Sequence, residues 1–306
     1  MDTVRGASAP DIEDILTAWA VSMPYDPVSR SALEAFLSNP RYCQTGSAAV
    51  AEKDGEAVGF AAGIAAEENA GWIPVFFVRP DLAGGRLADD LLDFVLEYLK
   101  RRGVTYVRAE PFEWSEARFF TGIDSRYSHI LDILERRGFV RTDESQVDIV
   151  KDLRDFRPAD DVAAARLSLE REGFTFTLCD EVTRRPYLEF LDKYFERYQG
   201  WRIGIRRQLE AGDLARHTLA LLSGEVVGFC AFDKETDWYI WASGVREDLR
   251  LKGIGTILVY LALEEITRRG AERMLVSDCP IEFYKILNGR IERHYVMLGR
   301  KLGGAL

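Results

Sequence analysis

The sequence predicts two tandem α/β domains, each built on a mixed β-sheet. Three observations lead to this fold class: a length of 306 residues, a pattern of segments that occurs twice, and a glycine-containing turn between an apolar strand and an amphipathic helix. Domains are typically about 100–200 residues long, so the chain is long enough for two hydrophobic cores. With 47% hydrophobic and 29% charged residues, the composition is that of a folded globular protein.

The first part of the repeat is a hairpin-like segment near the start of each half. It reads AVAEKDGEAVGFAAG at 49–63 and ALLSGEVVGFCAF at 220–232, and the core of the first copy recurs 169 positions later in the second. In both copies, apolar strands flank a tight Asp-Gly or Ser-Gly turn. This pattern is the strongest short-range signal for a β-hairpin.

The second part of the repeat is a strand end followed by a long helix. Residues 78–103 and 245–270 align at an offset of 167, and ten of the 26 aligned positions are identical. Two unrelated amphipathic helices would share composition, but they would not share the order of elements on either side. We therefore interpret the two halves as copies of one fold.

Each half is expected to contain a strand, one or two helices, a hairpin, a strand, a long helix, a strand, a short helix and a last strand. Strand, helix and strand at this spacing predict a right-handed βαβ unit within a mixed sheet. The predicted domains are 1–155 and 156–306, with 156–173 as the connection. The expected strands and short helices are 3–5, 11–21, 28–37, 72–78, 104–109, 127–137 and 146–150 in the first half, and 174–178, 184–198, 205–210, 238–245, 273–277, 280–287 and 295–298 in the second.

Composition also excludes several classes of function. A net charge of −10 disfavours binding to nucleic-acid phosphates and to anionic lipids. The four cysteines form no CxxC pair and are expected to be buried, reduced thiols, and the three histidines have no metal-ligand spacing. No signal peptide and no apolar stretch of about 18 residues is present, which predicts a cytoplasmic protein without a membrane span.

The candidate site is the turn Arg250-Leu-Lys-Gly-Ile-Gly255, which lies between the strand 238–245 and the helix expected from Thr256. Glycines allow a ligand to approach the backbone closely, and free N–H groups at a helix start attract anions, so this turn predicts a phosphate-binding loop. A P-loop would require Gly-Lys-Ser/Thr, and a Rossmann fingerprint would require a third small residue where Leu258 stands. Neither pattern fits.

The turn resembles the Arg/Gln-x-x-Gly-x-Gly/Ala motif of the acetyl-CoA-dependent N-acetyltransferase superfamily (GNAT), and the likeness extends over roughly 3–153 and 174–302. This resemblance implies two tandem GNAT-like acyl-CoA N-acyltransferase domains. In that superfamily the loop amides hold the acetyl-CoA pyrophosphate, and the preceding strand pairs with the pantetheine arm. The residues implied here are Ser243, Gly244, Val245, Arg250, Leu251, Lys252, Gly253, Ile254, Gly255 and Thr256.

A second likeness is the segment Phe283-Tyr-Lys-Ile-Leu287, which resembles the Phe-Tyr-x-x-x-Gly-Phe segment of the superfamily. The match is partial, because Asn288-Gly289 stands in place of Gly-Phe. The resemblance implies that the Tyr284 hydroxyl returns a proton to the leaving thiolate. The alternative is a helix tyrosine whose hydroxyl lies at the surface.

The N-terminal half departs from both patterns. Arg86 stands where the first motif glycine is expected and Ala83 where the arginine is expected, and Leu134 replaces the tyrosine. A side chain at position 86 would crowd the pyrophosphate, although an arginine there could instead pair with a phosphate. We therefore predict that the first half is mainly structural or contributes to the substrate cleft, and that the second half binds acetyl-CoA.

Acyl transfer to an amine also requires a base and donors at the developing oxyanion. The fold supplies the donors through main-chain amides, and Asp278 and Asp237 are the candidate bases. Alternatively, each is a solvated loop residue, and Asp278 could cap the short helix. Trp238, Tyr239 and Trp241 are expected to be core residues on two faces of their strand rather than a cage for a cation. The aromatic insertion 111–130 is either a binding lid or a packing segment.

Three function classes follow from the sequence. The first is an N-acetyltransferase that moves an acetyl group from acetyl-CoA to a primary amine of a small molecule or peptide, without a metal. The second is another acyl- or aminoacyl-transferase on the same fold. The third is a non-catalytic acyl-CoA-binding or sensor protein. Oligomer formation is possible but is not indicated by the sequence.

Overall fold

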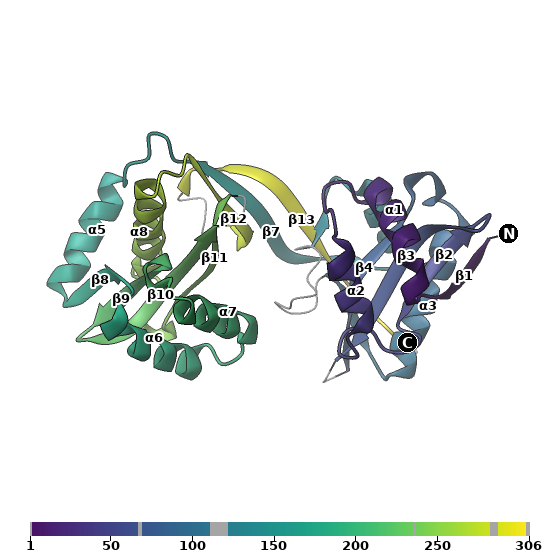
Figure 1. The fold of residues 1–306 in the computed structure, drawn as a ribbon, viewed down its shortest axis with the longest axis horizontal. Helices are drawn as coiled ribbons and strands as arrows, with labels where there is room; N and C mark the ends of the chain where they lie inside the picture. Colours follow the sequence, from purple (N-terminus) through teal and green to yellow (C-terminus); the bar gives the residue numbers. More distant parts are fainter. Residues whose placement is uncertain (1, 67–68, 111–121, 235–236, 282–286, 304–306) are drawn as a thin grey trace. The chain divides into compact units, whose positions relative to one another are not determined.

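The computed structural model describes residues 2–66, 69–110, 122–234, 237–281 and 287–303. Contacts between Cα atoms divide the chain into two units. Unit 1 contains Met1–Gln146 and Arg293–Leu306, and unit 2 contains Val147–Glu292. Two long strands, β7 and β13, pass from one unit to the other, and Figure 1 shows the elements along the chain.

Unit 1 has a mixed sheet in the order β1-β2-β3-β4-β5-β13-β7, and β6 pairs with β13. The pairing of β4 with β5 is parallel, whereas β1, β2, β3 and β4 pair antiparallel in sequence. The elements are β1 Thr3–Gly6, α1 Ile12–Ser22, α2 Arg30–Ser38, β2 Ala48–Lys53, β3 Glu56–Ala65, β4 Ala70–Val78, α3 Arg86–Arg101, β5 Tyr106–Ala109, β6 Ile123–Asp124, α4 Ser128–Arg136, and parts of β7 Val140–Asp152 and β13 Arg290–Lys301.

Unit 2 repeats this sheet in the order β7-β12-β11-β10-β9-β8, with β11 parallel to β12. Its elements are α5 Asp160–Arg171, β8 Phe174–Leu178, α6 Glu181–Tyr194, α7 Gln199–Glu210, β9 His217–Leu222, β10 Glu225–Lys234, β11 Trp238–Val245, α8 Ile254–Arg268 and β12 Arg273–Pro280. The predicted strand, hairpin, strand, long helix and strand are therefore present in both units. Most of the short helix expected at 280–287 lies outside the described residues.

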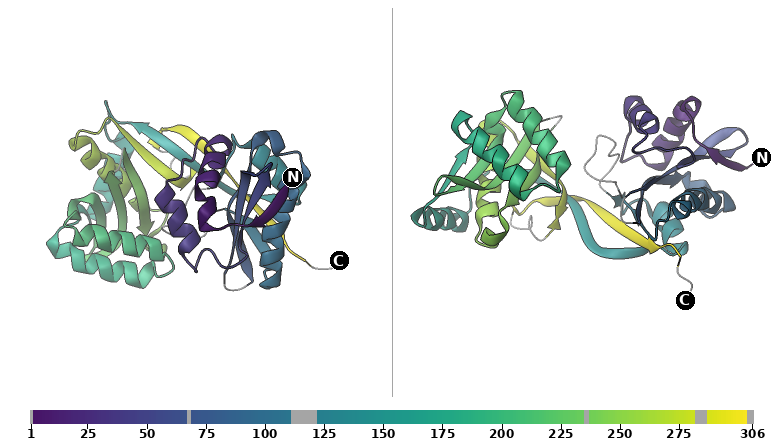
Figure 2. Two further views of the ribbon diagram at one scale, coloured as in Figure 1. Left: turned by 45° about the vertical axis from the view of Figure 1, so that its right-hand side comes forward. Right: turned by 90° about the horizontal axis from the view of Figure 1, so that it is seen from below.

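In each unit the sheet lies between two layers of helices. Figure 2 shows α1 and α2 on one side of the strands of unit 1 and α3 on the other side, and it shows α6 and α7 opposite α5 and α8 in unit 2. The core of unit 2 is correspondingly divided. One cluster of buried side chains lies between the sheet and α8, and an aromatic cluster lies between the sheet and helices α6 and α7.

Both predicted hairpins close with the same turn. Asp54 and Gly55 in the first, and Ser223 and Gly224 in the second, all have positive φ. Two consecutive residues with positive φ form a type I′ turn, whose twist matches that of the flanking strands. The repeat in the sequence therefore corresponds to a repeat in backbone conformation.

The division of the chain is not a single point. The sequence predicts one boundary near residue 155, whereas the units exchange within β7, after Gln146, and within β13, after Glu292. The end of β13 pairs antiparallel with β5, from Leu298↔Ala109 to Lys301↔Tyr106. Hydrogen bonding between strands that are distant in the sequence decides where β7 and β13 pass from one unit to the other. The local pattern of apolar residues does not indicate with which strand β13 pairs.

A buried ion-pair network holds the returning segment in unit 1. The guanidinium of Arg293 donates to both carboxylate oxygens of Asp26, at 2.8 and 2.7 Å, and to Asp124 Oδ2 at 2.7 Å. The Tyr127 hydroxyl donates to Asp26 Oδ2 at 2.7 Å, and Trp19 Nε1 donates to the Asp26 carbonyl at 2.7 Å. Every charge in this network therefore has a partner, as buried charges require.

The predicted connection 156–173 also has a defined structure. It contains α5, which packs on α8 in unit 2 through Leu169 and neighbouring apolar residues. The apolar spacing of this segment indicated an amphipathic helix, and its partner became visible only in the tertiary structure.

Candidate functional site

The predicted site lies where β11 and β12 separate. Among the described residues, the parallel register runs from Trp238↔Met274 to Ile240↔Val276 and then stops, although β11 continues to Val245. On its other side, β11 stays paired with β10 as far as Gly228↔Val245. The sheet is therefore open along one edge of β11, from Trp241 onward, where an extended ligand can lie beside the strand.

Trp241 forms a β-bulge at the start of this opening. Ala231 pairs with Ala242 and Phe232 pairs with Ile240, so Trp241 is left out of the register. A bulge re-aims the local backbone and puts two consecutive side chains on one face. Accordingly, Trp241 and Ala242 both pack in the aromatic cluster beneath α6 and α7.

The predicted phosphate-binding loop follows β11 through a short 3₁₀ turn, Glu247–Leu249. Arg250 is extended, Leu251 has φ 65°, and Gly253 has φ 85° and ψ 0° as the N-cap of α8. No side chain caps this helix start. Left-handed residues just before a helix turn main-chain N–H groups toward one concave point, which is the geometry of an anion site.

The charges around the loop also favour an anion. The first turn of α8 contains no acidic residue, and Arg250 and Lys252 stand in the loop itself. Asp248 is paired with Arg246 at 2.7 Å, and this guanidinium holds the pKa of Asp248 below its usual value. The carboxylate of Asp248 is thus neutralised within its own turn.

The corresponding loop of unit 1 begins in the same way and then diverges. The Arg79–Asp81 pair repeats Arg246–Asp248, but Ala83 is helical and Gly85 is extended. Arg86 is the first residue of α3 and pairs with Asp90 at 3.3 Å. The left-handed glycine of the second copy is therefore replaced by an additional helical residue.

The first turn of α3 also differs in charge, because it contains Asp89. Asp89 pairs with Arg136 at 2.9 Å. A carboxylate in this position occupies the favourable end of the helix dipole. Unit 1 thus lacks the cradle that unit 2 has, in conformation and in charge.

The bulge is present in unit 1 as well, but its residue is proline. Ala62 pairs with Val75 and Ile64 with Trp72, so β4 has one residue more than β3 between these pairs. Trp241 directly precedes Ala242 in unit 2, and the residue that directly precedes Val75 in unit 1 is Pro74. Proline has no main-chain N–H. Residues 73–78 of β4 are also buried, whereas Ser243, Gly244 and Val245 are partly exposed.

Gly244 lies at the centre of the open strand and packs directly on an aromatic ring. A Cβ atom built on Gly244 would lie 2.5 Å from Phe195 Cε1 and 3.0 Å from Phe229 Cε1. Phe195 follows α6 and is buried in the aromatic cluster. The sequence did not indicate Phe195, because the contact joins residues that are far apart along the chain.

The three predicted catalytic residues have different positions. Asp237 directly precedes β11 and pairs with Arg273 at 2.6 Å, at the closed end of the β11–β12 pair. Asp278 lies on β12, two residues beyond the last described pair with β11, and its side chain lies outside the described residues. Tyr284 lies outside the described residues too.

Trp238 and Trp241 pack on opposite faces of the sheet, as predicted. Trp238 belongs to the cluster beside α8, and Trp241 to the cluster beside α6 and α7. The benzo edge of Trp241 contacts α7 where Gly204 leaves room, since a Cβ there would lie 2.8 Å from Trp241 Cη2. The indole ring is therefore fixed between β11 and α7.

The cysteines are free, and three of them are buried. Cys43 is only half-buried, contrary to the expectation that all four would be buried, because it lies in the loop after α2 rather than in a strand. His217 is fully buried in β9, and burial lowers its pKa to about 3. Its Nδ1 lies 3.4 Å from the hydroxyl oxygen of Tyr187.

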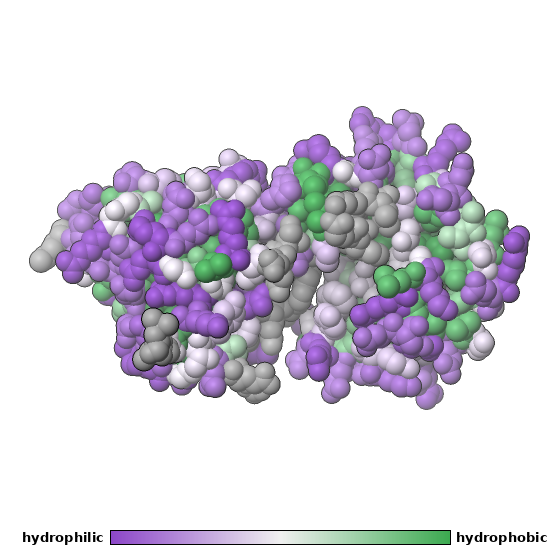
Figure 3. Space-filling view, turned by 180° about the vertical axis from the view of Figure 1, so that it is seen from behind, coloured by the Kyte–Doolittle hydropathy of each residue, from purple (hydrophilic) through white to green (hydrophobic). Residues whose placement is uncertain are grey.

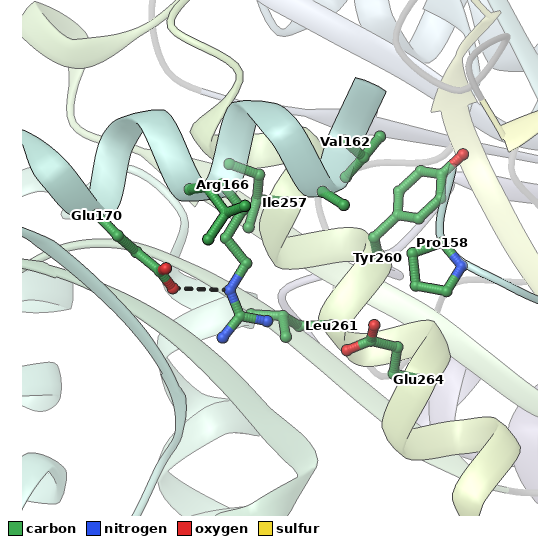
Figure 4. Close-up of a pocket in the computed structure, with 10 residues that line it drawn as sticks. Pro158, Val162, Arg166, Glu170, Ile257, Tyr260, Leu261 and Glu264 are labelled. Atoms are coloured by element: carbon green, nitrogen blue, oxygen red, sulfur yellow. Dashed lines mark hydrogen bonds and ion pairs between the residues drawn. The ribbon is translucent and has the colours of Figure 1, made fainter. Parts of the chain in front are cut away.

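A separate groove of about 390 Å³ lies between α5 and α8. Figure 4 shows Val162 and Arg166 of α5 facing Ile257 and Leu261 of α8, with Arg166 bonded to Glu170. The groove residues come from the sides of the two helices and from Pro158, which precedes α5, and none belongs to the predicted loop.

The described residues contain neither a metal-binding cluster nor a membrane-spanning helix. No group of three or more histidine, cysteine or acidic side chains is placed to hold a metal ion. In the part of the chain that the structure describes, every helix is too short or too polar to cross a membrane. On the face drawn in Figure 3, hydrophilic residues predominate and hydrophobic residues form small, separate patches.

Comparison with solved structures gives the same double fold. The chain superimposes on a GCN5-related N-acetyltransferase from Sphaerobacter thermophilus with a TM-score of 0.69 and 18% identity. The match covers 100% of this chain and 98% of that one. A tandem GNAT protein from the clavulanic acid biosynthesis pathway gives a TM-score of 0.62 and 16% identity, with both chains fully covered.

A third structure is a glucosamine N-acetyltransferase region of a fungal multi-domain β-N-acetylglucosaminidase. The TM-score is 0.74 and the identity 18%; the match covers 98% of this chain but only 38% of that longer protein. At such identities, the three likenesses show the fold. No curated protein sequence matches the chain.

The family model described as "Acetyltransferase (GNAT) family" matches the sequence twice, at residues 12–119 and 176–288, once in each copy of the fold. These two regions together span more than half of the chain. The protein therefore belongs to the acetyltransferase (GNAT) family.

Proposed function

We propose that the protein transfers an acetyl group from acetyl-CoA to a primary amine of a small molecule or peptide, directly and within unit 2. One observation carries this proposal: a single stretch, from Trp241 to Gly255, combines an open strand edge, a bulge and an uncapped helix start with a left-handed glycine. Unit 1 has no left-handed glycine at this helix start, and its bulge residue is a proline.

The loop is proposed to bind the pyrophosphate. Main-chain amides from Leu251 to Thr256 surround the helix start, and Arg250 and Lys252 add positive charge. A Cβ built on Gly253 would meet no atom within 4 Å, so the space over this residue is open to a ligand. The partly exposed edge of Ser243, Gly244 and Val245 is proposed to receive the pantetheine arm.

The bulge is proposed to stabilise the oxyanion. Trp241 is out of register with β10 and stands where the parallel pairing with β12 ends. The main-chain N–H at this point is proposed to donate to the thioester carbonyl of a ligand that follows β11. Donors that are already oriented in the folded protein stabilise developing charge without reorganisation.

Two side chains are proposed to move protons. As the amine nitrogen bonds to the thioester carbon and the C–S bond breaks, a base takes a proton from the amine and Tyr284 donates a proton to the thiolate. Asp278 suits the role of base better than Asp237. Its backbone lies beside the opening, whereas Asp237 is held by Arg273 at the closed end.

Unit 1 is proposed to have a structural role. The proposed acceptor is a primary amine of a small molecule or peptide. The protein is proposed to act in the cytoplasm, without nucleic-acid or membrane partners. The other two classes, a different acyl- or aminoacyl-transferase and a non-catalytic acyl-CoA sensor, differ in measurable ways. Release of CoA across a panel of amines distinguishes a transferase from a sensor, and a comparison of acyl chain lengths distinguishes the transferases.

The testing experiment is a calorimetric titration with acetyl-CoA. We expect about one molecule bound per chain, and we expect Gly253→Glu to abolish binding, because it puts a bulky anion in the cradle and a side chain at positive φ. Arg86→Glu changes the equivalent residue of unit 1 and should leave binding intact. Binding that survives Gly253→Glu, or that is lost only in Arg86→Glu, would place the site elsewhere.

A further inference from the structure

Two contacts between a glycine and an aromatic ring join the open part of β11 to the helices on one face of the sheet. Phe195, at the end of α6, covers the main chain of Gly244, where a Cβ atom would lie 2.5 Å from Phe195 Cε1. In the other direction, the Trp241 ring covers Gly204 of α7, where a Cβ atom would lie 2.8 Å from Trp241 Cη2. Residues 241–244, the open segment, are therefore held at both ends.

The Phe195 ring is itself fixed by other rings. It is buried, and its centroid lies 5.5 Å from that of Phe190 and 5.3 Å from that of Phe229. The pair with Phe229 is edge-to-face, an arrangement that aromatic rings prefer. Helix α6 and strand β10 thus hold the ring against which Gly244 packs.

The open segment needs this support, because it has a strand neighbour on one side only. Among the described residues, the parallel pairing with β12 ends at Ile240↔Val276, whereas the pairing with β10 continues to Gly228↔Val245. The bulge also removes Trp241 from the register. A segment with fewer ladder hydrogen bonds is more easily displaced. Packing on α6 and α7 therefore helps to fix the position of its main chain.

Neither contact is repeated in the described part of unit 1. At the offset of 167, Phe77 stands in the place of Gly244, and Pro74 in the place of Trp241. The Phe77 side chain is buried and meets the Trp19 ring of α1 edge-on, with the centroids 5.3 Å apart. The second helix of this unit, α2, contains no glycine. The two contacts thus belong to the copy that is proposed to carry out the reaction.

We propose that Gly204 is a positioning residue for acyl transfer, and that it acts through the Trp241 ring on the main-chain N–H of Trp241. The inference rests on the proposed function of unit 2, in which this N–H donates to the thioester oxygen. A donor stabilises the developing charge only where it is already oriented toward the oxyanion. A displacement of about 1 Å can lower the rate of a reaction about a hundredfold.

The test is Gly204→Ala in the full-length chain. Steady-state release of CoA, with the amine of the panel that the unchanged protein acetylates fastest, gives kcat, and calorimetry gives the Kd for acetyl-CoA. The added methyl group displaces the Trp241 ring and with it the bulge, so we expect kcat to fall about tenfold. The Kd should stay within twofold, because the loop at Gly253 is unchanged. Alanine favours a helix more than glycine does, so the midpoint of thermal unfolding should fall little.

A second substitution distinguishes this contact from other effects of the alanine. Trp241→Phe removes the benzo edge that contacts Gly204 and keeps the main-chain N–H. By itself it should lower kcat, because the ring no longer reaches α7. In the Gly204→Ala background it should instead raise kcat about three- to fivefold, since the overlap is gone. Such a change of sign is expected of residues in contact.

Gly63→Ala is the matched control in unit 1. A Cβ atom there would lie 2.7 Å from Val95 Cγ1, an overlap similar to that at Gly204. Overpacking should lower the midpoint of thermal unfolding of this variant. Its kcat, measured below that midpoint, should be unchanged.

The outcomes separate this inference from the function on which it rests. If the unchanged protein binds no acetyl-CoA or acetylates no amine, the proposed function is wrong, and the positioning role falls with it. If the unchanged protein acetylates an amine but Gly204→Ala keeps kcat within twofold, only the positioning role is wrong. The same holds if Trp241→Phe lowers kcat equally in both backgrounds, or if Gly63→Ala lowers kcat as much as Gly204→Ala does.

Discussion

Pro74 and Trp241 occupy the same bulge position in the two copies of the fold. Each lies between two pairs of its hairpin register. Trp241 is the first residue beyond the described parallel pairing with β12, and Pro74 is the second residue beyond the described parallel pairing with β5. A proline at a bulge costs no ladder hydrogen bond, since a bulge residue is outside the ladder. It does, however, remove the main-chain donor. This one difference predicts which copy can stabilise an oxyanion.

Replacing Trp241 by proline should therefore slow transfer strongly, because the main-chain donor is lost. We expect kcat to fall about 10²–10³-fold, the usual effect of losing one oxyanion donor. Affinity for acetyl-CoA should change much less, because the phosphate loop is untouched. Steady-state release of CoA and calorimetry measure the two effects separately.

Two controls accompany that variant. Trp241→Ala removes the indole but keeps the main-chain N–H, so it should retain far more activity than Trp241→Pro. Pro74→Ala restores an N–H in unit 1 and should leave kcat unchanged. Equal losses in Trp241→Pro and Trp241→Ala would show that the ring, rather than the main chain, matters.

Gly244→Ala should destabilise unit 2. The added methyl group would overlap the Phe195 ring, because its Cβ would lie 2.5 Å from Phe195 Cε1. Overpacking of this kind costs about 1–3 kcal/mol. Urea denaturation of the purified variant measures the change in the free energy of unfolding.

The second variant in this series is Phe195→Leu. Combined with Gly244→Ala, the smaller side chain should restore part of the lost stability, since the two residues are in contact. Gly84→Ala serves as the control, because its Cβ would enter open space, and we expect a change within about 0.5 kcal/mol. Additive losses in the double variant would contradict the packing argument.

Breaking the ion pair between Arg293 and Asp26 should destabilise unit 1. The two side chains are 17% and 5% exposed, and removing one partner leaves a buried charge unpaired. We expect Arg293→Met to cost about 3–5 kcal/mol, the range for breaking a buried ion pair. Urea denaturation followed by circular dichroism measures the change in the free energy of unfolding.

Asp152 and Arg154 form the comparison pair. Both are largely exposed, and exposed ion pairs contribute little to stability. Arg154→Met should therefore change the unfolding midpoint little. If Arg293→Met were equally mild, the network would not be what holds the end of β13 in unit 1.

The buried His217 should make the protein less stable in acid. Burial lowers the pKa of His217 from 6.5 to about 3 in the folded state. Between these values the unfolded chain binds a proton that the folded chain does not, so stability is lost as the pH falls through this range. The contribution of this residue to the free energy of unfolding falls by up to about 1.4 kcal/mol per pH unit.

The variant His217→Asn removes this titration and keeps a polar atom near the position of Nδ1. The free energy of unfolding, measured in urea at pH 7, 6 and 5, should fall less steeply for this variant than for the unchanged protein. His294→Asn, at an exposed histidine, should leave the slope as it was. An unaltered slope in His217→Asn would show that His217 does not titrate in this range.

The sequence by itself determined the local features of the protein. Internal repetition predicted two copies of one fold, and the structure shows both hairpins with the same positive-φ turns. Apolar spacing predicted β11 as Trp238–Val245 and β8 as Phe174–Leu178 to the residue. Glycines before a helix indicated the loop at Gly253, because turn and helix-start preferences act over a few neighbouring residues.

The alignment of the two copies contains one further signal, which indicates the position of the bulge. At the offset of 167, Pro74 falls on Trp241, and proline in a central strand indicates a bulge. The domain boundary and the role of Arg293 had no such signal. Both depend on which distant strand β13 pairs with.

The tertiary structure alone decided three things: the exchange of β7 and β13 between the units, the opening of the sheet after Ile240, and the contact of Phe195 with Gly244. Each of them joins residues that lie far apart along the chain. Local preferences fix the conformation of a segment, but hydrogen bonding and packing between segments fix its neighbours. For that reason the sequence could indicate the loop that is proposed to bind the pyrophosphate, and only the fold could show the open strand beside it.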